Sequence, residues 1–115
     1  MNEVTRTELL RRMDAMIADC ASQVKALEQD ERRDEAVFAK IRMNVYDIFR
    51  TVLKTAFSQP NPEAFFLEKL DQIPSSWRTS LSMALQHGKD EKAHIEQTKL
   101  DAAAQIRSLF LEVCP

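Results

Sequence analysis

Residues 34–58 carry the feature that most limits how this chain can fold. At 100° per residue, ten apolar side chains of this segment fall within an arc of roughly 200° on a helix surface. They are Val37, Phe38, Ile41, Val45, Ile48, Phe49, Val52, Leu53, Ala56 and Phe57. A helix that faces one neighbour needs an apolar stripe little wider than about 100°. We therefore expect a helix over Asp34–Ser58 that is contacted from two or three sides by the rest of the chain.

The scarcity of glycine limits the other structures that the chain can form. Gly88 is the one glycine among 115 residues. Phosphate-cradling loops, nucleotide-binding fingerprints and tight hairpin turns depend on glycine's access to positive φ, so we expect none of them. No window shows sustained period-two alternation, which disfavours strands. The sequence predicts an all-α fold.

The N-terminal part predicts a helix from Thr5 or Thr7 to Gln29. Its apolar residues follow heptad spacing and form one narrow stripe. They are Leu10, Met13, Ile17, Cys20, Val24 and Leu27. We expect the chain to turn within Asp30–Arg33, with Asp34 as the N-cap of the next helix. The alternative is one uninterrupted helix of about fifty residues, which would be about 75 Å long.

Prolines and capping residues divide the second half of the chain. Asn61 before Pro62 predicts the start of a helix over Pro62–Ile73, and Pro74 ends it by moving Ile73 out of the α region. A further helix starts at a Ser75 or Ser76 cap and ends at His87-Gly88, where Gly88 takes a left-handed conformation. Asp90 then caps a last helix that runs to about Val113.

The helix lengths predict the architecture. The first, second and last helices are similar in length, and the two helices around Pro74 together match them. Rods of equal length joined by short connections are typical of an up-down-up-down four-helix bundle. We expect a single domain over residues 1–115 with five helices, in which the third rod is broken at Pro74.

Composition argues against several function classes. The formal net charge is −2, and no basic stretch is interleaved with aromatic residues, so we expect no nucleic-acid partner. No run of 18 apolar residues is present, so we expect no membrane partner and a cytoplasmic protein. Cys20 and Cys114 do not form a disulfide framework; we interpret them as reduced thiols, with a terminal disulfide as the alternative.

Glu91 and His94 form a Glu-x-x-His pair, the spacing that carries metal ligands in ferritin-like bundles. Those proteins need two such pairs, and the second histidine here, His87, lies outside any pair. We interpret His94 as a solvated histidine near a helix start. A surface metal site of His87, Glu91 and His94 is the alternative, and we expect no cofactor.

Arg42 falls inside the apolar arc of the 34–58 helix. A buried guanidinium must be paired and hydrogen-bonded. We expect Arg42 either to extend its charged end to solvent or to form an ion pair with an acidic residue of a facing helix, such as Asp14 or Asp101. The alternative is an anion-binding arginine that lines a cleft.

Three stretches resemble sequences in a group of small all-helical proteins from clostridial-type bacteria that have no known activity. The stretches are DERRDEAVFAKIRMNVYDIF, FFLEKLDQIPSSWRTS and HGKDEKAHIEQTKLDAAAQI. The resemblance implies a bacterial cytosolic origin and no particular chemistry.

No catalytic arrangement of side chains is evident, so we expect a non-enzymatic interaction module that binds a protein partner or a second copy of itself. The predicted interaction surface consists of Leu9 and Met16 beside the first apolar stripe, with Phe65 and Leu67. The alternative is a helical bundle that binds a small ligand or a metal, through Arg42 or through Glu91 and His94.

Overall fold

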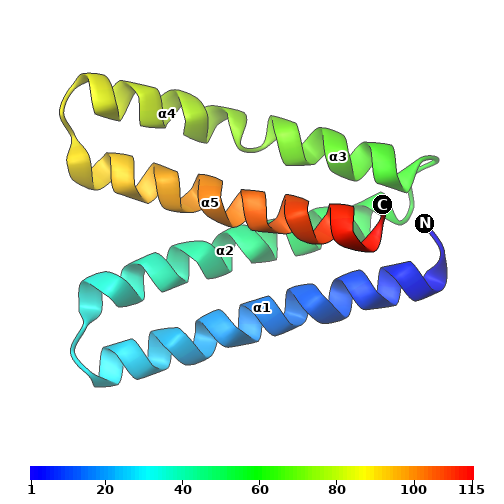
Figure 1. Ribbon diagram of the computed structural model, residues 1–115, viewed down its shortest axis with the longest axis horizontal. Helices are drawn as coiled ribbons and strands as arrows, with labels where there is room; N and C mark the ends of the chain where they lie inside the picture. The colour runs from blue at the N-terminus through cyan, green and yellow to red at the C-terminus, as the bar shows by residue number, and fades with distance from the viewer.

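The computed structural model describes residues 1–115 and contains five helices and no strand (Figure 1). The helices are α1 (Glu3–Gln29), α2 (Arg33–Ala56), α3 (Pro62–Gln72), α4 (Ser75–Gln86) and α5 (Asp90–Val113). Successive rods alternate in direction, with α3 and α4 together forming the third rod. The predicted all-α, up-down-up-down bundle with a third rod broken at the Pro74 region is confirmed.

The chain reverses between α1 and α2 through a left-handed residue that is not glycine. Glu31 has φ 58°, and the Arg32 N–H donates to the Leu27 carbonyl at 2.9 Å. This is the Schellman arrangement that ends many helices. The same arrangement ends α4, where Gly88 has φ 65° and the Lys89 N–H donates to the Ala84 carbonyl at 2.8 Å. The predicted turn after Gln29 and the left-handed Gly88 are both confirmed, and the single long helix is excluded.

Several predicted helix starts are wrong by one or more residues. The first helix starts at Glu3, before Thr5, because the Asn2 side chain accepts a hydrogen bond from the Thr5 N–H. The second and fifth helices start at Arg33 and Asp90, so neither Asp34 nor Asp90 is an N-cap. Both carboxylates lie in a first turn instead, where they complement the helix dipole. The predicted Asn61 cap of α3 is confirmed, with a hydrogen bond from the Ala64 N–H.

Pro74 bends the third rod rather than fully separating its helices. Ile73 keeps α-region dihedral angles, contrary to the prediction, and Pro74 is itself in the α region. The break arises because proline has no N–H to continue the ladder. The Ser75 hydroxyl does not cap α4 as predicted; it donates to the Gln72 carbonyl at the end of α3. Ser76 lies inside α4.

The four rods form a flattened bundle. The molecule measures 43 × 35 × 20 Å, and the two parallel rods, α2 and α5, pack directly against each other (Figure 1). In an up-down-up-down bundle parallel rods occupy diagonal positions, so their close approach pushes the other two rods outward. One of these outer rods, α1, packs mainly on α2, while α4 packs on α5.

The central helix α2 contacts α1, α3 and α5, which confirms that it is covered from several sides. Val45, Phe49 and Leu53 are buried in it. The full width of the predicted apolar arc is not covered, however. Val37 is 47% exposed and Ile48 is 39% exposed, because α4 packs on α5 and does not extend over this side of α2.

The large core side chains gather where α3 meets the ends of the other rods. Phe66 of α3 lies between two aromatic rings: the Phe49 ring is at 6.4 Å in an edge-on arrangement, and the Phe110 ring is at 4.9 Å. Leu9, Met13, Leu53 and Ile106 complete the set of fully buried large side chains. None of the helices is long and apolar enough to cross a lipid bilayer.

Candidate ligand groove

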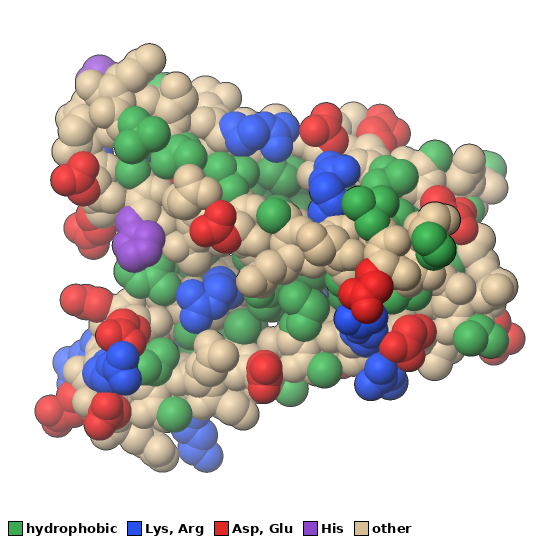
Figure 2. Space-filling model, viewed as in Figure 1, with side chains coloured by type: hydrophobic (Ala, Val, Ile, Leu, Met, Phe, Trp, Pro, Cys, Tyr) green, Lys and Arg blue, Asp and Glu red, His purple; other side chains and the backbone are tan.

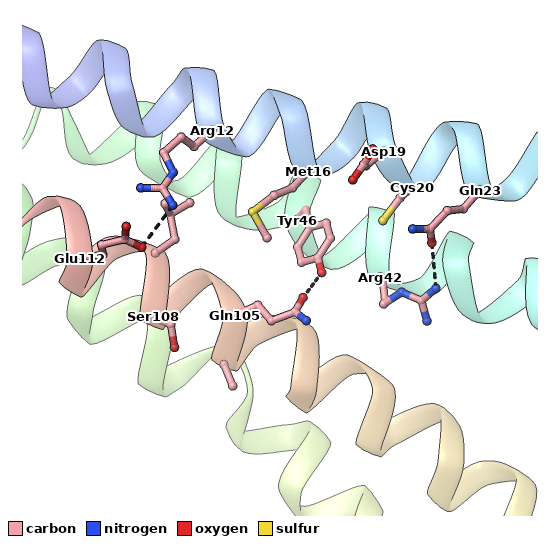
Figure 3. A pocket seen from close by; sticks show the side chains of 12 residues that line it. Arg12, Met16, Asp19, Cys20, Gln23, Arg42, Tyr46, Gln105, Ser108 and Glu112 are labelled. Atoms are coloured by element: carbon pink, nitrogen blue, oxygen red, sulfur yellow. Dashed lines mark hydrogen bonds and ion pairs between the residues drawn. The ribbon is translucent and has the colours of Figure 1, made fainter.

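The gap between α1 and α5 forms an open groove of about 600 Å³, and α2 forms its floor (Figure 3). It exists because these two helices contact each other little, while each packs on α2. Twelve residues line it, with polar side chains on its walls and apolar ones between them. Its volume lies within the range of about 300–1,000 Å³ that is typical of small-molecule sites.

Arg42 lies in this groove, half-buried, and has no acidic partner. Its guanidinium donates one hydrogen bond, to the Gln23 side-chain oxygen at 3.3 Å. The predicted ion pair with Asp14 or Asp101 is wrong. Asp14 pairs with Arg50, and Asp101 accepts a hydrogen bond from Gln97. Arg42 therefore has no carboxylate partner for its positive charge at the floor of the groove.

A hydrogen bond links the floor of the groove to the wall opposite α1. Tyr46 of α2 is 4% exposed, and its hydroxyl donates to the side-chain oxygen of Gln105 in α5 (Figure 3). Burial raises the pKa of Tyr46, and the nearby Arg42 guanidinium opposes this effect. The phenol is therefore neutral at physiological pH and ties the floor of the groove to one wall.

Cys20 lies in the groove beside Arg42 and is 5% exposed. Burial raises the pKa of this thiol, and the Arg42 guanidinium only partly opposes that shift. Cys114 is half-buried, and neither cysteine is in a disulfide, as the interpretation of reduced thiols predicted. The Cys20 thiol is therefore protonated at neutral pH and a poor nucleophile.

An ion pair across the groove closes one of its ends. Arg12 of α1 donates to the Glu112 carboxylate of α5 at 3.2 Å, so these two charges compensate each other (Figure 3). Asp19 lies on the rim of the groove, is exposed and makes no ion pair. The groove thus contains one ion pair, Arg12 with Glu112, and two unpaired charges, Arg42 and Asp19.

The three candidate metal ligands lie apart from this groove. His87, Glu91 and His94 are exposed, and no group of three or more His, Cys, Asp or Glu side chains is close enough to hold a metal ion together. The His94 ring stacks on Phe38 of α2 at 4.0 Å. This stack joins α5 to α2 near the end of the bundle that holds the turns after α1 and α4, a contact that the sequence did not reveal.

The predicted interaction surface is not a single exposed face. Leu9 is only 1% exposed and belongs to the core, so its placement on a surface is wrong. Its position beside the apolar stripe faces the core because α2 and α5 both pack on that side of α1. Phe65 and Leu67 are half-buried against the core, and half-buried Met16 lines the groove.

The exposed large apolar side chains are elsewhere. They are Val4, Val37, Ile48, Met83, Leu85 and Leu111. Figure 2 shows apolar side chains scattered among charged ones on one face of the molecule, without a large uninterrupted patch.

Glu96 is a buried charge that sequence reasoning missed. It is 6% exposed, its Oε1 accepts from Lys99 at 3.3 Å, and its Oε2 has no hydrogen-bond partner. The Lys99 ammonium also lies 5.9 Å from the Trp77 ring centre. The burial of Glu96 depends on how the neighbouring helices pack on α5, for which the sequence carries no direct signal.

Comparison with protein-family models, curated proteins and solved structures finds no match to this chain. The resemblance to helical proteins of clostridial-type bacteria therefore stays a prediction.

Proposed function

We propose that this protein is a non-enzymatic binding module that holds a small organic anion in the groove between α1 and α5. The observation that carries the proposal is Arg42, a half-buried guanidinium with no carboxylate partner. The unpaired Arg42 favours the predicted ligand-binding bundle over the predicted interaction module.

Most of the hydrogen-bond donors of Arg42 have no partner in the protein. A guanidinium offers five N–H donors in a planar fork that matches a carboxylate or phosphate. Arg42 uses one of them on Gln23. An anion that enters the groove could accept two more in parallel, at a position where the protein has already removed part of the surrounding water. Hydrogen bonds to charged groups contribute about 1.5–3 kcal/mol each.

The other groove residues support binding rather than catalysis. The raised pKa of Cys20 keeps its thiol protonated, and the Tyr46 hydroxyl is already committed to Gln105. These groups can shape and orient a ligand but are not prepared to attack it.

The test is a titration of isotope-labelled protein with a panel of small carboxylates and phosphates, followed by two-dimensional NMR. We expect shifts that cluster at Arg42, Gln23, Tyr46 and Gln105. Arg42→Gln should weaken binding roughly ten- to a hundredfold. Arg11→Gln removes the same charge from an exposed site that pairs with Glu8, and should change affinity little. Equal losses in both variants, or shifts scattered over the surface, would contradict the proposal.

Self-association stays a prediction from the sequence. Sedimentation equilibrium at micromolar concentrations tests it, and a monomer at every concentration would count against it.

A further inference from the structure

We infer that the groove selects an amphipathic monocarboxylate and rejects polyanions such as phosphate. This inference rests on the proposed function, because it concerns the ligand that the same groove accepts.

The charges around the groove set the first limit. Arg12 is engaged by Glu112, so Arg42 is the one cation of the groove that is free to pair with a ligand. Asp19 adds an unpaired carboxylate at the rim. It lies four residues before Gln23, which contacts Arg42, and residues so spaced share a helix face. A ligand with one negative charge is balanced by Arg42. A second negative charge would meet no free cation and would be repelled by Asp19.

The apolar lining sets the second limit. The apolar side chains of the lining include Met16, Cys20, Ala104 and Leu109. Figure 3 shows Met16 between Arg42 at one end and the Arg12–Glu112 pair at the other. Along α1 the groove extends from Arg12 to Gln23, about 16 Å at 1.5 Å per residue. A carboxylate at Arg42 therefore leaves room for an apolar body along Met16 and Leu109. The Arg12–Glu112 ion pair limits the length of that apolar body. An apolar chain that covered the pair would remove water from both charges and give them no new partner.

Two series of ligands test the inference in calorimetric or NMR titrations of the intact protein. In the first, acetate, butyrate and hexanoate share a head group and differ in apolar length. Affinity should rise about two- to fourfold for each methylene that becomes buried. In the second, hexanoate is compared with adipate, which has the same carbon number and a second carboxylate, and with inorganic phosphate. We expect both to bind at least tenfold more weakly than hexanoate.

Matched variants separate the contribution that the ligand's carboxylate makes to affinity from the contribution of its apolar chain. Met16→Gln should weaken hexanoate and leave acetate unchanged, since only the longer ligand reaches Met16. Asp19→Asn should improve adipate and phosphate relative to hexanoate, because it removes the repulsive charge at the rim.

The outcomes distinguish this inference from the proposed function. If adipate or phosphate binds as tightly as hexanoate and depends on Arg42, monocarboxylate selectivity is wrong and anion binding stands. If affinity does not change with chain length, the apolar part of the ligand does not lie in the groove and the inference is wrong. If Asp19→Asn weakens hexanoate, the rim carboxylate attracts the ligand and the inferred class is wrong. If no anion binds through Arg42, both the inference and the proposed function fail.

Discussion

The two ends of the bundle are built from different side chains. At the end where α3 packs on α2 and α5, large residues such as Phe49, Phe66 and Phe110 are buried together. At the other end, which holds the turns after α1 and α4, the buried apolar residues are alanines. They are Ala36, Ala39, Ala84 and Ala93.

This difference explains the shape of the molecule. Large side chains can bridge four rods, because each fills the space between several helices. Alanine instead lets two backbones approach closely and reaches no further. The open end therefore consists of two closely packed helix pairs, α1 with α2 and α4 with α5, which separate from each other (Figure 1). The groove lies between α1 and α5, which contact each other little.

The largest expected effect concerns the aromatic cluster. Phe66→Ala should destabilise the protein by about 3–5 kcal/mol, because it removes a fully buried ring and leaves a cavity. Phe38→Ala, at the open end, removes a half-buried ring and its stack on His94, and should cost less than about 1.5 kcal/mol. Urea unfolding of both variants measures the two values. Equal losses would mean that the two ends share one core.

The alanines of the open end provide a test of close approach. Ala39 is fully buried, so Ala39→Leu should force the helices apart at a cost of about 1–3 kcal/mol. Ala15→Leu makes the same change on the exposed side of α1 and should stay within about 0.5 kcal/mol of the parent. Thermal unfolding distinguishes them. A stable Ala39→Leu variant would show that this end is loosely packed.

The two turns of the open end should respond to substitution with opposite signs. Gly88→Ala places a Cβ where no atom lies within 4 Å, so its cost is the left-handed backbone alone. After the lower entropy of the unfolded chain is subtracted, that cost is about 1 kcal/mol. Glu31→Gly should stabilise the protein by a similar amount, because Glu31 already has the strained left-handed backbone and glycine adopts it without strain. Chemical denaturation of the two single variants checks the signs, and two changes of the same sign would contradict the argument.

The smallest effect concerns Tyr46, which links the groove floor to α5 and is the one tyrosine of the chain. Burial raises its pKa above the ordinary value of about 10. Its contribution to stability is therefore complete below about pH 10 and is lost as the pH rises toward the folded-state pKa. Arg42→Gln should raise the pKa further, since the guanidinium favours the phenolate. Near-ultraviolet absorbance of the phenolate measures both; an unchanged pKa in the variant would place Arg42 far from Tyr46.

Part of the candidate site could be predicted from the sequence. The position of Arg42 on the apolar arc indicated a guanidinium that is not fully solvated, and anion binding was one of its two interpretations. Its partner could not be predicted, because only the packing of α1 on α2 decides that Arg42 meets Gln23 and that Arg50 meets Asp14. Glu96 was missed for the same reason, since its burial depends on how the neighbouring helices pack on α5.

The sequence by itself determined the helices, the turns at Glu31 and Gly88 and the central place of α2. These follow from local propensities and from apolar periodicity, which act over a few residues. Only the tertiary structure decided which diagonal pair of rods makes contact. That choice depends on how large and small side chains fit between helices that are distant in sequence. Because α2 packs directly on α5, Val37 and Ile48 are exposed, Leu9 is buried, and a groove lies beside an arginine that has no acidic partner.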